Sequence, residues 1–387
     1  MSSLDDPRRL VHYGQESVSN VSSTDFPGYD PSNDYLWDIV QFKKSLVVKV
    51  QRLSDVTIEF DIVGIDTSIA NAFRRILIAE VPTMAIEGVY LFNNTSVIQD
   101  EVLGHRIGLI PLKVDPTNFE YLTPGGGASD RNTLVFDLLI ECKRNPKAKA
   151  GETDPEKLYI NSNVYSRDLK WKPQGEQDEV FQVPPAPANP NILIAKLRPG
   201  QEIEAQFHAH KGKGEEHAKW SPVATASYRL LPHITIQEPI LPRSIPKFKN
   251  CFPAGVIESR TNPSTGEEEV FVANPRKDTM SREVLRHEEF KDIVKLARVR
   301  DFFLCEWALP TSWFLVDLLA IILSDCNGTN NLDYLVSIES AGQMPPEQLF
   351  PQAVNVLREK IARIRADIDT YITASISVDV DMVDATE

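Results

Sequence analysis

Histidines at two places in this sequence could carry chemistry. His105 and Arg106 stand between Gly104 and Gly108, and a positioned histidine is the usual group for acid–base catalysis. No serine, cysteine or aspartate stands nearby in a pattern that demands a catalytic triad. We therefore favour a structural turn in which Gly108 allows close backbone approach, with a free-standing enzyme built on His105 as the alternative.

The second group is His208, His210 and His217 with the neighbouring Glu215 and Glu216, a set that could bind a metal. The loop between these residues contains glycines, and the first two histidines share a face only if their segment is a strand. We favour exposed strand and loop histidines, and we expect neither a metal nor another cofactor. An enzyme that uses this cluster is the alternative.

Composition argues against direct nucleic-acid binding. The 387-residue chain has 41 Lys and Arg against 55 Asp and Glu, a formal charge of −14, whereas nucleic-acid-binding proteins usually carry a basic excess. Its four cysteines are far apart and form no CxxC pair, which suits a reducing compartment better than a zinc site. Hydrophobic residues make up 42% of a chain whose length predicts about two domains.

Two strands and a helix are predicted near the N-terminal end. The runs 47–50 and 56–62 are β-branched or alternate with a period of two, which is typical of strands. A helix follows, which Asp66 or Thr67 can cap and Pro82 ends. One face of this helix is an apolar stripe for a core or a dimer interface, made of Ile69, Phe73, Ile76 and Leu77. The other face carries Asn71, Arg74 and Arg75.

Further elements follow along the chain. Strand-like runs occur at 85–92, 133–142 and 228–237, and a charged helix is predicted over about 281–300. A last helix is predicted over about 347–371, where apolar residues recur every three or four positions and include Leu357, Ile361, Ile364 and Ile368. A seam of this length packs against another helix, which belongs either to a second chain or to the core of this one.

Three segments together resemble the alpha-type subunits of cellular RNA polymerases. The first reads DTSIANAFRRILIAEVP over residues 66–82, and the second reads DEVLGHRIGLIPL over residues 100–112. The third, HAKWSP over residues 217–222, is similar to the end of the insert domain in the archaeal and eukaryotic members. The resemblance covers about residues 20–375, apart from one segment described below.

Within this family, the sequence is similar to the larger alpha-like subunit shared by RNA polymerases I and III. The polymerase II member carries a cluster of zinc-binding cysteines in its insert domain, whereas here that domain holds Cys142 alone. The segments TDFPG at 24–28 and NNTSVIQD at 93–100 also resemble the shared subunit.

The resemblance implies an α+β fold in which a mostly β insert domain interrupts a dimerisation domain. We expect a polar N-terminal tail at 1–38, a dimerisation domain at 39–84 and 226–375, an insert domain at 85–225 and an acidic tail at 376–387. The implied function is a non-catalytic scaffold of RNA polymerases I and III, for synthesis of ribosomal RNA precursor, 5S rRNA and tRNA. It would lie in the nucleus, including the nucleolus, without contacting nucleic acid or membrane directly.

The family also implies partners and roles for particular residues. The chain would pair with a small alpha-like subunit and dock the second-largest subunits of polymerases I and III, with Arg75 at that contact beside Asn71 and Arg74. Gly104, His105, Arg106 and Gly108 form the family's second motif. The alternative for the arginines is solvated or intrachain ion pairs, and the alternative for pairing is a homodimer like that of the bacterial alpha subunit.

Residues 305–335 interrupt the family pattern, in which 298–304 passes almost directly into 336–342 to make one strand. The apolar run 302–323 is as long as a membrane helix but contains two acidic residues and a proline. We interpret the segment as a translated intron. Cys305-Glu306-Trp307 can be encoded TGT GAG TGG, which contains the donor sequence GTGAGT, and Leu335-Val336 can be encoded CTA GTN, which supplies a closing AG. A genuine loop is the alternative.

Overall fold

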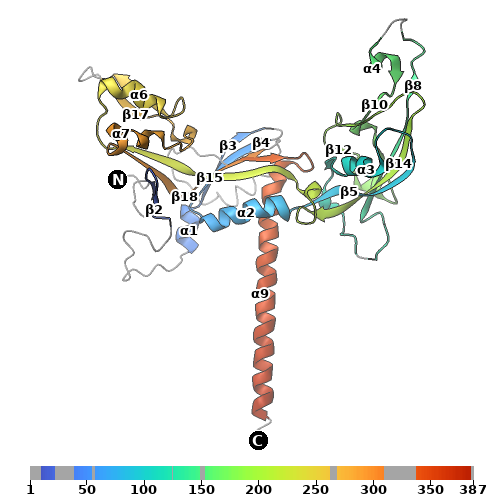
Figure 1. The fold of residues 1–387 in the computed structure, drawn as a ribbon. Coiled ribbons are helices and arrows are strands. Elements are labelled where there is room, and N and C mark those ends of the chain that lie inside the picture. The colour runs from blue at the N-terminus through green and yellow to red at the C-terminus, as the bar shows by residue number, and fades with distance from the viewer. Residues whose placement is uncertain are drawn as a thin grey trace.

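The computed structural model describes residues 10–21, 39–54, 57–123, 125–148, 153–261, 268–308 and 337–384. These residues form a central sheet, a second sheet at one end of it and a small module of short helices at the other (Figure 1). A long helix, α9, projects from the central sheet (Figure 1). The fold is α+β, as the sequence predicts.

The central sheet has seven antiparallel strands in the order β2-β1-β18-β15-β19-β4-β3, with a further pairing of β18 with β4. Their bounds are β1 Leu10–Tyr13, β2 Val18–Ser19, β3 Val47–Leu53, β4 Thr57–Val63, β15 Val223–Ile236, β18 Val294–Ala308 and β19 Ser337–Ser340. β3 and β4 coincide with the two strands predicted at 47–50 and 56–62. Because β15, β18 and β19 come from the second half of the chain, the sheet joins both halves.

The predicted N-terminal tail is wrong for residues 10–19. β1 pairs with β18 and β2 pairs with β1, so this segment forms the edge of the central sheet. Leu10 and Val11 are each only 7% exposed. The four residues of β1 supply too little pattern to stand out from the polar residues around them. Residues 22–38 lie outside the described residues.

One face of the central sheet is covered by helices. Ile58, Phe60 and Ile62 alternate along β4 and are buried against α2 (Thr67–Ala79) and the start of α9 (Pro346–Asp384). Burying each such side chain contributes roughly 1.5–3 kcal/mol. α1 (Ile39–Ser45) adds Phe42 to the same cluster. The period of two in β4 therefore fixes which face the helices cover.

A buried ion pair lies on the other face of β4. The Asp61 side chain is fully buried, and Nη2 of Arg276 donates to its two carboxylate oxygens at 2.9 and 3.1 Å. Nε2 of Gln51 in β3 donates to Oδ2 of Asp61 at 3.2 Å. Arg276 belongs to the short helix η8 (Pro275–Lys277), so this pair fastens a distant segment to the sheet.

The region predicted to be the insert domain is built on a four-stranded sheet with the order β11-β7-β14-β5. Its strands are β5 Pro82–Asn94, β6 Leu112–Lys113, β7 Thr133–Glu141, β8 Lys143–Arg144, β9 Tyr159–Ile160, β10 Asn163–Tyr165, β11 Lys170–Lys172, β12 Ala186–Pro187, β13 Leu193–Lys196 and β14 Glu202–Lys213. Its helices are α3 Asp100–Gly108, α4 Pro155–Leu158 and α5 Gln177–Val180, with the short turns η4 Pro116–Asn118, η5 Ser166–Asp168 and η6 Ala218–Trp220. The expected boundaries at 84/85 and 225/226 fall inside β5 and β15.

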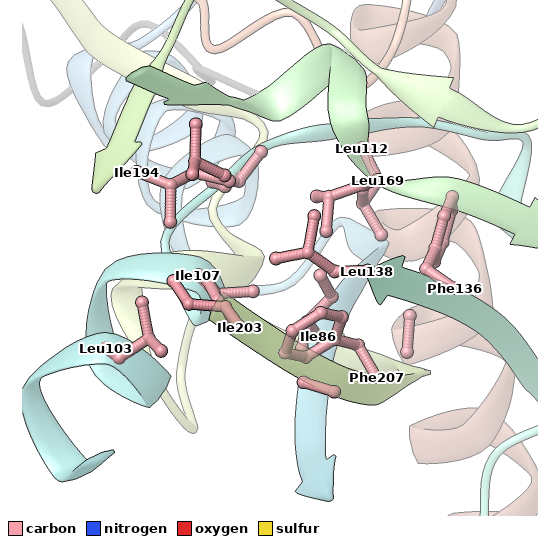
Figure 2. Packing of buried hydrophobic residues seen from close by; sticks show 14 of the residues in the cluster. Ile86, Leu103, Ile107, Leu112, Phe136, Leu138, Leu169, Ile194, Ile203 and Phe207 are labelled. Carbon is pink, nitrogen blue, oxygen red and sulfur yellow. The ribbon is translucent and has the colours of Figure 1, made fainter. Parts of the chain in front are cut away.

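The core of the insert domain lies between its sheet and α3. Figure 2 shows Leu103 and Ile107 of α3 in one cluster with Ile86 of β5 and with Ile203 and Phe207 of β14, all of them buried. Cys142 is a free thiol buried in the same cluster. The apolar face of α3 therefore holds this helix against the sheet.

The helix predicted over 281–300 is wrong. This region contains only η9 (Glu283–Arg286) and α7 (Glu288–Lys291) before β18 begins at Val294. Val294 and Leu296 are buried beside Phe290, so the alternation of the strand overrides the helical charge pattern. The rest of this end module comprises η7 Pro242–Ser244, α6 Ile245–Asn250, β16 Ile257–Thr261 and β17 Glu268–Val272.

Helix α9 extends beyond its predicted end. It runs to Asp384, so most of the expected acidic tail at 376–387 is helical instead. Among the helices that the structure describes, none has both the length and the apolar character of a membrane span. Most of the apolar run 302–323 lies outside the described residues.

Candidate subunit interfaces

The N-terminal end of α2 is fixed by a cap. The Asp66 carboxylate accepts from the Ser68 backbone N–H at 2.8 Å, which satisfies one of the free donors at a helix start. Ile76 and Leu77 then point into the core of the central sheet. Phe73 is half-buried, with its ring 5.1 Å from that of Phe350 in α9. Ile69 remains 36% exposed, so this part of the apolar stripe is open to solvent in the single chain.

The polar residues of α2 have different surroundings. Nε of Arg74 donates to Oδ1 of Asn71 at 3.1 Å, which orients both half-buried side chains. Arg75 is exposed and makes no hydrogen bond or ion pair within the described part of the chain. A guanidinium with its donors unused can bind a carboxylate or carbonyl of another molecule. The three residues predicted for one interface thus form an orienting pair and one free cation.

The helix α9 leaves the body of the protein after Leu357. Leu357 packs against the core of the central sheet, but Ile361, Ile364 and Ile368 are 59%, 59% and 52% exposed. Their spacing of three and four places them on one helix face, which we call the α9 stripe. Figure 1 shows this part of α9 standing clear of both sheets. An exposed stripe on a projecting helix is typical of a surface that a second helix covers.

An ion pair holds α9 at its point of exit. Nζ of Lys360 donates to Oε1 of Glu80 at 2.6 Å, and Glu80 is the residue that ends α2. Both side chains are partly exposed, so this pair contributes little to stability. Its position links the end of α2 to the first exposed turn of α9.

The second family motif is a helix and not the predicted turn. Gly104, His105, Arg106 and Gly108 all lie in α3. A Cβ on Gly108 would lie 3.4 Å from the Ile86 carbonyl oxygen, so α3 passes close to β5 at this point. The buried Leu103 and Ile107 have helical spacing, and this spacing outweighs the two glycines.

Arg106 has a structural role in this motif. Its Nε and Nη2 donate to the backbone carbonyls of Ile194 and Leu193, at 3.1 and 2.7 Å. Both acceptors lie in β13, so one guanidinium ties α3 to this strand. The planar arrangement of donors in arginine suits two successive carbonyls, whereas a lysine ammonium is a single point charge.

Replacing Arg106 by Ala is expected to destabilise the insert domain. Hydrogen bonds from charged groups contribute about 1.5–3 kcal/mol each when buried, and partial exposure here reduces the expected loss to about 1–2 kcal/mol in total. Urea unfolding of the purified chain measures the change. Arg106→Lys keeps the charge, and we expect it to recover less than half of the loss. Equal stability of all three proteins would contradict this role.

His105 lines a groove of about 840 Å³ between α3, β5 and η6. Glu101, Glu87 and Glu216 also line it, and Glu87 is paired with Lys219. The lining includes no serine or cysteine. The groove therefore places His105 in one lining with carboxylates, with His217 and with Lys219.

The other histidines are held by local contacts. The ring of His208 lies against that of Tyr90 at a tilt of 56°, with centroids 4.7 Å apart, and burial lowers the pKa of His208. Nδ1 of His210 lies 3.2 Å from Oγ1 of Thr133. His217 caps η6 by accepting from the Lys219 backbone N–H at 3.1 Å. Within the described ranges, no three metal-binding side chains gather at one point.

The HAKWSP segment follows directly on the residues where the insert sheet meets α2, because the backbone N–H of Glu215 donates to the Ala79 carbonyl. Trp220 is buried, and a Cβ on Gly212 would lie 2.4 Å from its ring. A Cβ on Gly214 would lie 2.2 Å from the carbonyl oxygen of Ile78 in α2, so the chain passes this helix at very short range. The glycines between the histidines are therefore required by packing, which the sequence alone did not indicate.

Comparison with known proteins gives one family for most of the chain. A family model described as the RNA polymerase Rpb3/Rpb11 dimerisation domain matches residues 59–361. This range includes α2, the whole insert domain and the start of the α9 stripe.

Individual relatives match over nearly their full length. The DNA-directed RNA polymerases I and III subunit RPAC1 of Saccharomyces cerevisiae is 48% identical over 91% of this chain and 96% of its own length. The protein of the same name from Homo sapiens is 44% identical over 95% of this chain and 97% of its own length. The DNA-directed RNA polymerase II subunit rpb3 of Dictyostelium discoideum is 27% identical over 85% of this chain.

Proposed function

Because this chain belongs to the family of alpha-like RNA polymerase subunits that carry the Rpb3/Rpb11 dimerisation domain, we propose that it is a non-catalytic subunit of RNA polymerases I and III. It pairs with a small alpha-like subunit, and the pair docks the second-largest subunit of each enzyme. It serves the synthesis of ribosomal RNA precursor, 5S rRNA and tRNA in the nucleus, including the nucleolus. Relatives named for polymerases I and III are 34–48% identical, whereas relatives named for polymerase II are 27–28% identical.

The observation that carries the pairing is the α9 stripe. Ile361, Ile364 and Ile368 are more than half exposed on a helix that projects beyond the body of the chain. Completing the burial of these side chains would contribute roughly 1 kcal/mol each. The partner therefore presents an apolar helix to α9, as two-helix interfaces with this spacing require.

The surroundings of the histidines agree with a non-catalytic subunit. His208 lies against Tyr90 and His217 caps η6, while His105 is exposed on α3. The acidic balance of the chain also agrees with a subunit that contacts other proteins and leaves the template to other chains.

Co-expression with a small alpha-like chain tests the pairing. We expect the two proteins to elute together as a one-to-one complex in size-exclusion chromatography with mass determination. A homodimer of this chain in the presence of that partner would support the bacterial type of assembly and contradict the proposal. A chain that stays monomeric and does not bind the partner would also contradict the proposal.

Replacing Arg75 by Glu is expected to weaken docking of the second-largest subunit while leaving the heterodimer intact. Arg75 is exposed and unpaired among the described residues, so its reversal costs the folded chain little. Loss of an arginine contact at the centre of an interface costs about 2 kcal/mol or more, which is about 30-fold in Kd. Binding of the purified heterodimer to the second-largest subunit measures the effect.

Arg144→Glu is the matched control for this experiment. Arg144 is equally exposed but lies in β8 of the insert domain, far from α2 in the fold (Figure 1). It introduces the same charge change, so a general electrostatic effect would weaken both variants alike. Equal binding of the Arg75 and Arg144 variants would remove Arg75 from the proposed interface.

A further inference from the structure

Strands β18 and β19 occupy the same place in the central sheet. Both pair with β15 on one side and with β4 on the other. Glu306 of β18 and Ser337 of β19 even share partners, because each pairs with Glu59 and with Ser227. Each residue of a strand has one backbone N–H and one C=O. Glu59 and Ser227 therefore cannot form full backbone hydrogen bonds with two strands on the same side.

The register shows how the two strands relate. On β4, Leu304 pairs with Asp61 and Ser337 pairs with Glu59, which leaves the single residue Phe60 between them. Antiparallel strands pair residue for residue. There is therefore space for one residue between Leu304 and Ser337.

The other neighbour gives the same result independently. On β15, Leu304 pairs with Arg229 and Ser337 pairs with Ser227, again with one residue, Tyr228, between them. In the sequence, however, 32 residues, 305–336, separate Leu304 from Ser337. Removing 31 of these 32 residues would make β18 and β19 one continuous strand, without a gap or a bulge against β4 or β15.

We infer that the polypeptide that works in the cell lacks a 31-residue segment at this point, and that residues 305–335 come from an intron retained in the transcript. If Cys305-Glu306-Trp307 is encoded TGT GAG TGG, splicing at the donor sequence leaves the first T of the Cys305 codon. If Leu335-Val336 is encoded CTA GTN, splicing at the acceptor leaves the last two bases, TN, of the Val336 codon. Joining them gives TTN, which encodes Phe or Leu, so the mature chain reads Leu304, then Phe or Leu, then Ser337.

The position of this junction residue agrees with an apolar side chain. It would stand opposite Phe60 and Tyr228, and residues directly opposite on neighbouring strands point to the same face of the sheet. Phe60 is 3% exposed and Tyr228 packs against the same cluster. A Phe or Leu at the junction thus completes the core under α2 and α9.

Mass spectrometry of the chain purified from its own cells tests the inference directly. Trypsin cleaves after Arg300 and Arg358, and the peptide between them crosses the junction. We expect Leu304 followed by Phe or Leu and then Ser337, with transcripts that lack the corresponding bases. A chain whose uninterrupted 301–358 peptide matches the abundance of its other peptides would overturn the inference.

A set of recombinant chains tests the register. One variant replaces residues 305–336 by a single Phe, and two controls place no residue or two residues there. We expect the one-residue junction to give the highest thermal midpoint, above the full 387-residue chain. The controls should have lower thermal midpoints than the one-residue variant, because a slip of one residue turns every side chain of β19 to the opposite face. A full-length chain as stable as the one-residue variant would contradict the inference.

Discussion

Replacing Ile364 by Asp is expected to prevent the chain from pairing with its small alpha-like partner. Ile364 is in the middle of the α9 stripe and is 59% exposed, so the fold of the single chain does not depend on it. In a helix pair the aspartate would be buried without a partner, and the apolar contact would be lost as well. Together these effects cost about 4 kcal/mol or more, which is about 10³-fold in Kd.

Ala366→Asp is the control for this variant. Ala366 lies about half a turn around the helix from Ile364 and is also exposed. It adds the same carboxylate to the same turn, so any effect of charge or of helix propensity is shared. Affinity capture of the partner should fail for the Ile364 variant and succeed for the Ala366 variant. Equal capture by both would place the dimer interface elsewhere.

Replacing Asp61 by Ala is expected to have the largest effect on stability. The carboxylate is fully buried and accepts two hydrogen bonds from Nη2 of Arg276, so its loss leaves a nearly buried guanidinium without its anion. Breaking a buried pair from one side costs about 3–5 kcal/mol. Urea unfolding of the chain, followed by intrinsic fluorescence, measures the loss.

A double variant separates the effect of leaving one charge unpaired from the effect of changing the side chains at this site. Asp61→Leu with Arg276→Met removes both charges and keeps the space filled with apolar atoms. Buried pairs replaced in this way often lose little stability, so the double variant should be more stable than Asp61→Ala. A double variant that is destabilised by the sum of its two single changes would show that the two residues act independently.

The elements with a clear hydrophobic period were predictable from the sequence. The alternation in 56–62, the stripe of α2 and the spacing of 357–368 all depend on local patterns, and β4, α2 and α9 follow them. The cap at Asp66 is likewise encoded within a few residues. The arginine face of α2 was identified by resemblance to a family, because an exposed cation alone does not indicate a partner.

The features that sequence reasoning missed depend on contacts between distant residues. Leu10 and Val11 are buried only because β18 lies beside them, nearly 290 residues later. The pair of Asp61 with Arg276 joins residues 215 positions apart. Charge density at 281–300 favoured a helix, but pairing with β15 and β1 makes most of the second half of that segment a strand. Gly104 and Gly108 suggested a turn, whereas packing of Leu103 and Ile107 against the insert sheet holds a helix there.

The central claim is that this chain is a scaffold shared by RNA polymerases I and III. The most direct test is to tag the chain in its own cells, purify it and identify the proteins that accompany it. We expect the large subunits of both polymerases together with a small alpha-like chain. Recovery of polymerase II subunits alone would contradict the assignment to polymerases I and III, and recovery of the chain without any polymerase subunit would contradict the scaffold function itself.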